Sequence, residues 1–233
     1  MAMIADNSPG RGGVARDGSV RRAPGGPVGP DLALVPGWSF DGAVFAAMRD
    51  ALPCPARVFA PGEDAAAVPA GAIGVGHSLG GLWLLRHAAG RLRGLVLING
   101  FARLTAAVDW PDGVAPRVLA RMRARCATEP EAVVAAFRAR IGAPEGLPVA
   151  EAGRLAAGLA ELATWDMRAE LARLRVPVLC LAAPDDGLVS VALSRATAAL
   201  AGGAPDWQAG GHCLPLSAPH WCAARIAAFA ARA

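Results

Sequence analysis

Short apolar runs alternate with longer Ala- and Leu-rich stretches along the chain from residue 31 onward. The runs have the length of strands buried on both faces, and the stretches between them have the spacing of helices. This alternation predicts an α/β domain over 31–233, with a mostly parallel sheet and helices on both of its faces. The predicted strands are 31–38, 56–61, 72–78, 94–100, 177–184 and a weak last one at 204–210, and the predicted helices include 40–52, 79–92 and 220–232.

Two regions depart from the alternation. Residues 1–30 are rich in Gly, Pro and Arg without a hydrophobic period, which predicts a disordered N-terminal tail. Residues 101–175 contain no convincing strand, and prolines interrupt their Ala/Arg/Leu helices. We interpret 101–175 as a helical lid inserted between two strands of the sheet. The interrupting prolines are Pro111, Pro116, Pro130, Pro144 and Pro148.

Composition narrows the function classes. The net charge of +4 is too small for a nucleic-acid footprint, and no nucleic-acid-binding motif is evident. The 5 cysteines form no CxxC pair or metal-type cluster, which indicates free thiols in a reducing cytoplasm. No apolar run reaches transmembrane length, and the first residues lack the apolar core of a signal peptide. We expect a cytoplasmic monomer with no membrane partner, no metal and no cofactor.

The segment Gly76-His77-Ser78-Leu79-Gly80 is a G-x-S-x-G motif between a predicted strand and a predicted helix. In this context the serine occupies a strained turn that exposes its hydroxyl, and the glycines avoid clashes around it. The N-terminus of the following helix favours developing negative charge. The motif predicts Ser78 as a nucleophile. The alternative is a Gly-rich turn that only packs closely.

A serine nucleophile needs a histidine base and an acid that orients it, in the chain order Ser, acid, His. Asp185 and Asp186 follow the fifth predicted strand and are the candidate acids. His212, in a Gly-rich loop after the last strand, is favoured as base over His220, which begins the final helix. Two other histidines, His77 beside the serine and His87 in the next helix, are expected to be structural.

An oxyanion hole needs two backbone N–H groups that face the tetrahedral oxygen. One is expected from Leu79, directly after the serine, and the other from the loop after the first strand, at Gly37-Trp38. In the alternative interpretation this loop is an ordinary strand-exit turn, and Trp38 is only a core aromatic residue.

With these residues in place, the chain resembles the pimeloyl-ACP methyl ester esterases of biotin synthesis, within the α/β-hydrolase superfamily. The elbow and the triad order belong to the whole superfamily, whereas the Asp-Trp-Pro segment after the fourth strand is more specific to the esterases. The stretch 61–71 is short where relatives carry a longer loop and a helix. The resemblance rests on 34–45, 76–85, 97–111, 185–189 and 210–215, and it spans most of 31–233.

The resemblance implies roles for individual residues. In the strand-exit pattern G-x-x-D-x-x-V of the superfamily, Asp186 matches the acid and Asp185 does not, and His212 matches the base. Trp38 and Leu79 match positions that line the oxyanion hole and touch the substrate. A further run, Phe137, Arg138, Ala139, Arg140 and Ile141, is similar to the lid segment that contacts the pimeloyl chain.

Arginines recur on one predicted lid helix. Arg117, Arg121 and Arg125 are four residues apart, so they share a helix face. Such a basic face suits an acidic acyl carrier protein (ACP) and the phosphate of its phosphopantetheine. Equally, it suits a solvated arginine face in a chain without lysine.

Three functions are therefore considered. The first is a serine carboxylesterase that hydrolyses the methyl ester of pimeloyl-ACP through an acyl-enzyme. The second is a general short-chain esterase or thioesterase with the same triad, in which the lid arginines are incidental. The third is a non-catalytic hydrolase-fold protein that binds an acyl group or a partner. The presence of all three triad residues in the right order argues against the third.

Overall fold

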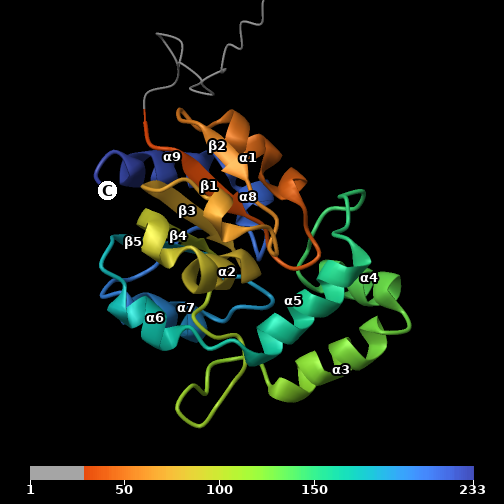
Figure 1. Ribbon diagram of the computed structural model, residues 1–233. Coiled ribbons are helices and arrows are strands. Elements are labelled where there is room, and N and C mark those ends of the chain that lie inside the picture. Colours follow the sequence, from red (N-terminus) through yellow and green to blue (C-terminus); the bar gives the residue numbers. More distant parts are fainter. Residues whose placement is uncertain (1–28) are drawn as a thin grey trace, which may run out of the picture.

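A computed structural model describes residues 29–233, so the tail predicted for 1–30 lies outside the described residues except for its last two. The core is a single parallel sheet with the strand order β2-β1-β3-β4-β5-β6 (Figure 1). Each predicted strand is present, so the mostly parallel α/β fold is confirmed. The strands are β1 (Leu32–Val35), β2 (Ala56–Val58), β3 (Ala72–His77), β4 (Leu92–Ile98), β5 (Val178–Ala182) and β6 (Asp206–Trp207).

Helices cover both faces of the sheet. Gly74 pairs with Leu95, and its neighbour Ile73 pairs with Gly94, so the two glycines point to opposite faces. A Cβ at Gly74 would meet Leu84, and one at Gly94 would meet Phe229. Leu84 belongs to the helix α2 (Leu79–His87), which packs with α6 (Arg168–Arg173) and, through it, α7 (Val191–Leu200). Phe229 belongs to α9 (Pro219–Ala230), which packs with α1 (Ala46–Asp50) and α8 (Leu214–Ser217).

Several predicted boundaries move. The helix predicted for 40–52 begins as the 3-10 helix η1 (Gly42–Phe45) before α1. The helix predicted for 79–92 ends at His87 and is followed by η3 (Ala89–Arg91), and β4 starts at Leu92, two residues before the predicted strand. The short stretch 61–71 holds only η2 (Ala65–Ala67) where an α-helix would cross over.

Helix α7 is an element that the hydrophobic pattern does not predict. Its buried face includes Ser194 and Thr197 beside Leu193 and Ala198. Two polar residues on the buried face break the apolar period by which an amphipathic helix is recognised.

The insertion predicted for 101–175 lies between β4 and β5 and is helical. Two of its helices begin at prolines, where the missing N–H costs no helix hydrogen bond. Within the insertion, only the isolated bridges Thr105–Val114 and Ala107–Trp110 have strand character. Helices α3, α4 and α5 gather at one side of the molecule, and α3 packs against both others (Figure 1). Their bounds are α3 (Pro116–Cys126), α4 (Pro130–Arg140) and α5 (Ala152–Thr164).

The two ends of the insertion are joined by ion pairs. Asp166 pairs with Arg103 at 2.9 Å and with Arg168 at 2.7 Å, and Arg168 also reaches Asp109 at 2.9 Å. These bonds lower the pKa of Asp166 to about 2, with the hydrogen bond from Arg168 as the largest cause. The carboxylate therefore stays charged and keeps the start and end of the insertion together.

Candidate active site

Ser78 lies on the sharp turn between β3 and α2. Its backbone has a positive φ of 52° with ψ of −120°, a conformation that non-glycine residues rarely adopt. The neighbouring glycines are required by close backbone approaches. A Cβ at Gly76 would collide with the backbone of Gly81, and one at Gly80 would collide with the carbonyl oxygen of Val35. The turn therefore presses the start of α2 against the loop that follows β1.

His212 and Asp186 meet beside this turn. The His212 Nδ1–H donates to Asp186 Oδ2 over 2.8 Å, and the two side chains are 1% and 0% exposed. The backbone N–H groups of Leu188 and Val189 donate to Asp186 Oδ1 over 2.7 and 3.0 Å. Burial raises the pKa of Asp186, but the hydrogen bonds from His212 and the backbone outweigh it and lower the pKa overall. An ionised Asp186 holds the proton of His212 on Nδ1 and leaves Nε2 free as a base.

Asp185 has a different neighbour from Asp186. Its carboxylate accepts from the backbone N–H groups of Gly210 and Gly211 over 3.0 and 3.1 Å, and these bonds lower its pKa. The side chain is exposed and does not touch His212 through any hydrogen bond among residues 29–233. Asp185 therefore fixes the loop that carries His212, while Asp186 contacts the imidazole itself.

Asn99 is a site residue that the sequence analysis did not single out. It follows β4, has a φ of 47°, and donates from Nδ2 to Asp186 Oδ2 over 2.8 Å. The side chain is 1% exposed. The sequence did hold a signal for Asn99. It is the polar residue near the end of the apolar predicted strand 94–100, and that strand pairs with the one that precedes Asp186.

His77 connects the serine turn to the His212 loop. It is fully buried, and its Nε2–H donates to the carbonyl oxygen of His212 over 3.0 Å. Burial is the largest cause that lowers the pKa of His77, to about 3, so the imidazole is neutral. Its Nδ1 has no partner among the described residues. His77 therefore bonds to the backbone of the segment that carries the candidate base, and its structural role stays a prediction.

The loop after β1 lies against Ser78. A Cβ at Gly37 would lie 3.1 Å from Ser78 Cβ and 3.0 Å from His77 Nδ1. No hydrogen bond joins Ser78 Oγ to His212 within residues 29–233, and such bonds are often long before substrate binds and tighten in the complex. The backbone N–H groups of Trp38 and Leu79 likewise donate to no acceptor in the described chain. They are free to donate to a bound oxygen.

The side chain of Trp38 faces the insertion. Its indole Nε1–H donates to the carbonyl oxygen of Leu155 on α5 over 2.8 Å. Its ring meets that of Phe137 on α4 edge to face, with 4.8 Å between ring centroids. Trp38 therefore joins the loop beside Ser78 to two helices of the insertion.

The residues from Phe137 to Ile141, which the sequence analysis predicts to contact the substrate, lie in different surroundings. The Arg138 guanidinium donates to the carbonyl oxygens of Ser39, Leu147 and Pro148, and burial is the largest cause that lowers its pKa. It therefore ties α4 to two loops. Ile141 is buried, and Arg140 reaches the carbonyl oxygen of Gly187 over 3.5 Å.

Three cavities of the described chain adjoin the insertion; the one of about 430 Å³, between α3 and α5, includes none of the predicted site residues, and the other two do. The smaller, of about 270 Å³, is mostly apolar and includes Trp38, Phe137 and Leu188, with Arg121, Arg125 and Arg140 among its polar lining residues. The larger, of about 690 Å³, lies along α4 and the segment before α5, and takes in Arg138 and Ala139. Neither lining includes Ser78 or His212. The smaller cavity is the one nearer to the candidate triad. Trp38 follows Gly37, which lies against Ser78, and the backbone N–H of Leu188 donates to Asp186.

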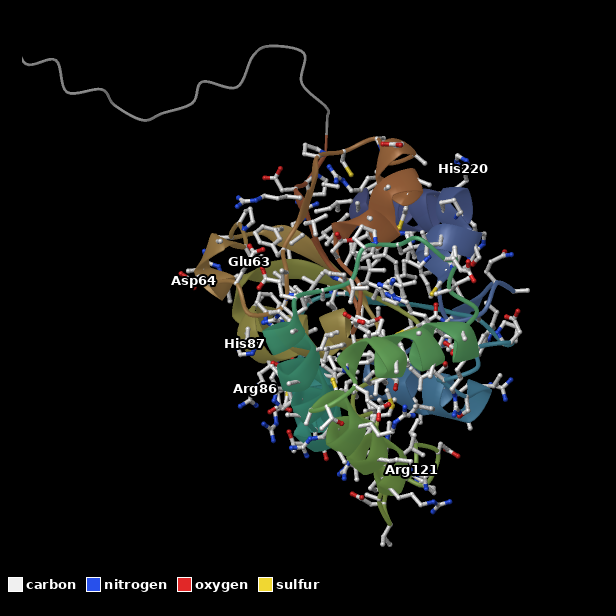
Figure 2. The ribbon with its side chains drawn as sticks, turned by 90° about the vertical axis from the view of Figure 1, so that its right-hand side faces the viewer. Glu63, Asp64, Arg86, His87, Arg121 and His220 are labelled. Atoms are coloured by element: carbon white, nitrogen blue, oxygen red, sulfur yellow. The ribbon has the colours of Figure 1, made fainter. Side chains whose placement is uncertain are left out.

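The remaining predicted residues lie at the surface. Arg117, Arg121 and Arg125 are exposed on α3, and Arg125 pairs with Glu129 at 2.7 Å. Figure 2 shows Arg121 and His220 at opposite ends of the molecule, with His220 on the outside of α9. His220 is exposed and makes no hydrogen bond to Asp186 in the described part of the chain.

Within residues 29–233, the side chains of His, Cys, Asp and Glu form no group of three suited to hold a metal ion. In the same residues, no helix combines the length and apolar character that crossing a bilayer requires.

Comparisons with known proteins place the chain among esterases. It is 33% identical to the pimeloyl-[acyl-carrier protein] methyl ester esterase of Stenotrophomonas maltophilia, over 76% of this chain and 82% of that protein. The esterase of the same name from Xanthomonas oryzae is 31% identical, over 74% and 83%. No family model matches the chain.

The fold comparison agrees with the sequence comparison. An esterase from Exiguobacterium antarcticum superposes with a TM-score of 0.71 at 14% identity, over 88% of this chain and 93% of that one. At this identity the likeness shows the fold alone. Taken with the curated relatives, these findings show that the chain is a carboxylic ester hydrolase of the α/β-hydrolase fold and belongs to the pimeloyl-[acyl-carrier protein] methyl ester esterase family.

Proposed function

We propose that this protein hydrolyses the methyl ester of pimeloyl-ACP, a step of biotin synthesis, with Ser78 as nucleophile, His212 as base and Asp186 as the acid that orients His212. The observation that carries the proposal is the buried His212–Asp186 pair, 2.8 Å apart, beside a strained serine turn. Such a pair has a use in acyl transfer and costs free energy to bury, so a binding protein would have no need of it.

The proposed chemistry follows from these positions. His212 Nε2 accepts the proton of Ser78 as Oγ attacks the ester carbonyl, and the negative charge that develops on the carbonyl oxygen is stabilised by the N–H groups of Trp38 and Leu79. The bond to the methoxy oxygen breaks, and His212 returns the proton to it, so methanol leaves. Water, deprotonated by His212, then attacks the acyl-enzyme, which releases the free carboxylic acid and regenerates Ser78.

The substrate assignment has two supports. The curated relatives at 31–33% identity carry the name of this activity. The cavity of about 270 Å³ next to Trp38 has an apolar lining that suits an alkyl chain, and Phe137 and Arg140 of the predicted lid run belong to it. We assign the insertion, 101–175, as a lid that covers the alkyl chain of the substrate.

The carrier assignment rests on charge. Arg121 and Arg125 are exposed and also line the cavity, so a carrier bound across its mouth would meet both. Guanidinium groups suit the phosphate of phosphopantetheine and the acidic surface of a carrier protein. Arg117 shares their helix face but lines neither cavity, so we assign it a peripheral contact with the carrier.

One observation favours the second candidate, a general short-chain esterase or thioesterase. Arg125 is paired with Glu129 at 2.7 Å, which reduces the free positive charge on α3. If the lid arginines are incidental, hydrolysis of small esters would exceed that of carrier-bound substrate at equal concentration.

The decisive test is complementation of a biotin auxotroph that lacks this esterase, with wild type and Ser78→Ala expressed to equal levels. Growth with wild type alone is expected. Labelling of wild type but not Ser78→Ala by a fluorophosphonate probe would assign the nucleophile independently. Labelling without growth would favour the general esterase, and growth supported by Ser78→Ala would overturn the proposal.

A further inference from the structure

Gly158 lies in the middle of α5, where the helix faces the candidate oxyanion hole. The residue is buried, and a Cβ built on it would lie 2.7 Å from Trp38 Cδ1, 3.5 Å from Trp38 Nε1 and 3.1 Å from Leu79 Cδ2. A separation of 2.7 Å is shorter than carbon–carbon contacts in proteins allow. Either α5 or the two side chains would have to move.

Trp38 cannot easily turn away from this contact. Its indole Nε1–H is bonded to the carbonyl oxygen of Leu155, three residues earlier on α5, over 2.8 Å. Phe137 of α4 packs against its ring edge to face, with 4.8 Å between centroids. Trp38 and Leu79 are only 4% and 2% exposed, and because Trp38 also lines the cavity of about 270 Å³, it is these two contacts that hold its indole in place.

The two residues that contact Gly158 are the two that carry the candidate oxyanion donors. Trp38 supplies one backbone N–H and Leu79 the other, and both groups lack an acceptor in the described chain. Their side chains rest on a single turn of α5. A displacement of either side chain is transmitted to its own backbone because each is packed tightly in the core.

We propose that Gly158 is a positioning residue for the oxyanion hole: the bare backbone of α5 at this point sets how Trp38 and Leu79 sit and therefore where their N–H groups point. This inference rests on the proposed function, since it needs Ser78 to form a tetrahedral intermediate. Its consequence is that the insertion does more than cover the acyl chain. The placement of α5 against the sheet adjusts the stabilisation of the transition state.

The chain offers a matched control on the same helix. Gly153 is exposed in the first turn of α5, and a Cβ there would meet nothing within 4 Å. Gly153→Ala and Gly158→Ala make the same chemical change, and both replace glycine by a better helix former. Only the second places a carbon against Trp38 and Leu79.

The test compares wild type, Gly153→Ala and Gly158→Ala in hydrolysis of p-nitrophenyl butyrate, with circular dichroism and melting temperature as checks of folding. Displacing a donor should lower kcat about tenfold or more in Gly158→Ala, with KM within about twofold, because these donors act mainly in the transition state. Affinity for butylboronic acid, whose tetrahedral adduct with Ser78 mimics that state, should fall by a similar factor. A merely structural role would lower stability without this match between kcat and boronate affinity.

A double variant tests the route. In a Trp38→Ala background the main clash is absent, so adding Gly158→Ala should change kcat by less than about threefold if the effect passes through the indole. An equal loss in both backgrounds would overturn the inference, as would a folded Gly158→Ala enzyme with the kcat of Gly153→Ala. Those results leave Ser78-dependent turnover by wild type intact, whereas its absence would overturn the proposed function and this inference together.

Discussion

The end of the sheet and the insertion use charge in opposite ways. At the sheet end, the Asp186 side chain is 0% exposed and accepts from His212, Asn99 and two backbone N–H groups. On α3, the arginines are exposed, and Arg125 pairs with a glutamate that is itself exposed. A buried, fully hydrogen-bonded charge fixes geometry and is screened little by salt, whereas exposed charges select what approaches and are screened within about 8–10 Å. Substitutions at the sheet end should therefore change kcat, whereas charge changes on α3 should change substrate binding in a salt-dependent way.

The sharpest test of the sheet end compares two neighbouring carboxylates. Asp186→Asn removes the charge that holds the His212 proton on Nδ1, so kcat should fall by about 10⁴, as for a wrong tautomer of the base. Asp185→Asn only loosens the loop at Gly210 and Gly211, and kcat should fall about tenfold at most. Steady-state kinetics with p-nitrophenyl butyrate measures both. Equal losses would remove the distinction between the two carboxylates.

The buried imidazole of His77 makes a second test, on stability. An unfolded histidine binds a proton below about pH 6.5, whereas folded His77 does so only at about pH 3, so unfolding takes up a proton between these values. Stability from this group is present above pH 6.5 and is lost as pH falls toward 3, at about 1.4 kcal/mol per pH unit. His77→Gln keeps a donor toward the His212 carbonyl but lacks this dependence. Urea unfolding at pH 7, 6, 5 and 4 should show a shallower decline for the variant, and parallel profiles would contradict it.

Charge changes in the insertion should affect only the carrier-bound substrate, and the effect should depend on salt. Reversing Arg121 and Arg125 to Glu should raise KM for pimeloyl-ACP methyl ester about 30-fold at low salt and leave p-nitrophenyl butyrate turnover unchanged. The control is Arg123→Glu, the same charge change on another face of α3, which should have little effect. If turnover of the small ester also falls, or if the rise in KM persists at high salt, these arginines stabilise the fold and do not bind the carrier.

The smallest expected effect concerns Asn99. Asn99→Gly keeps the left-handed backbone without strain and removes the hydrogen bond to Asp186, so kcat should fall about tenfold with KM unchanged. Asn99→Ala serves as comparison, since it loses the same bond and adds backbone strain that should lower the melting temperature further. An Asn99→Gly enzyme with wild-type kcat would show that the remaining donors suffice for Asp186.

The sequence allowed the sheet to be predicted because parallel strands buried on both faces have a plain apolar signature. The serine turn was predictable because its geometry demands glycines at fixed spacing around Ser78. Helix α7 was not, because Ser194 and Thr197 lie on its buried face. Contacts between distant segments, such as His77 with the His212 carbonyl or Gly158 with Trp38, have no local pattern at all. They arise only from tertiary packing.

The parallel sheet has a consequence for how activity appears during refolding. The residues of the site follow five different strands, and a single hydrogen bond between two of these segments spans 135 residues of chain. Contacts of such sequence separation form slowly, because loop closure must precede them. Helices and local turns should thus return well before ester turnover does. Recovered activity would therefore report the last strand to join the sheet, which makes hydrolysis a probe of complete folding and not of the serine turn alone.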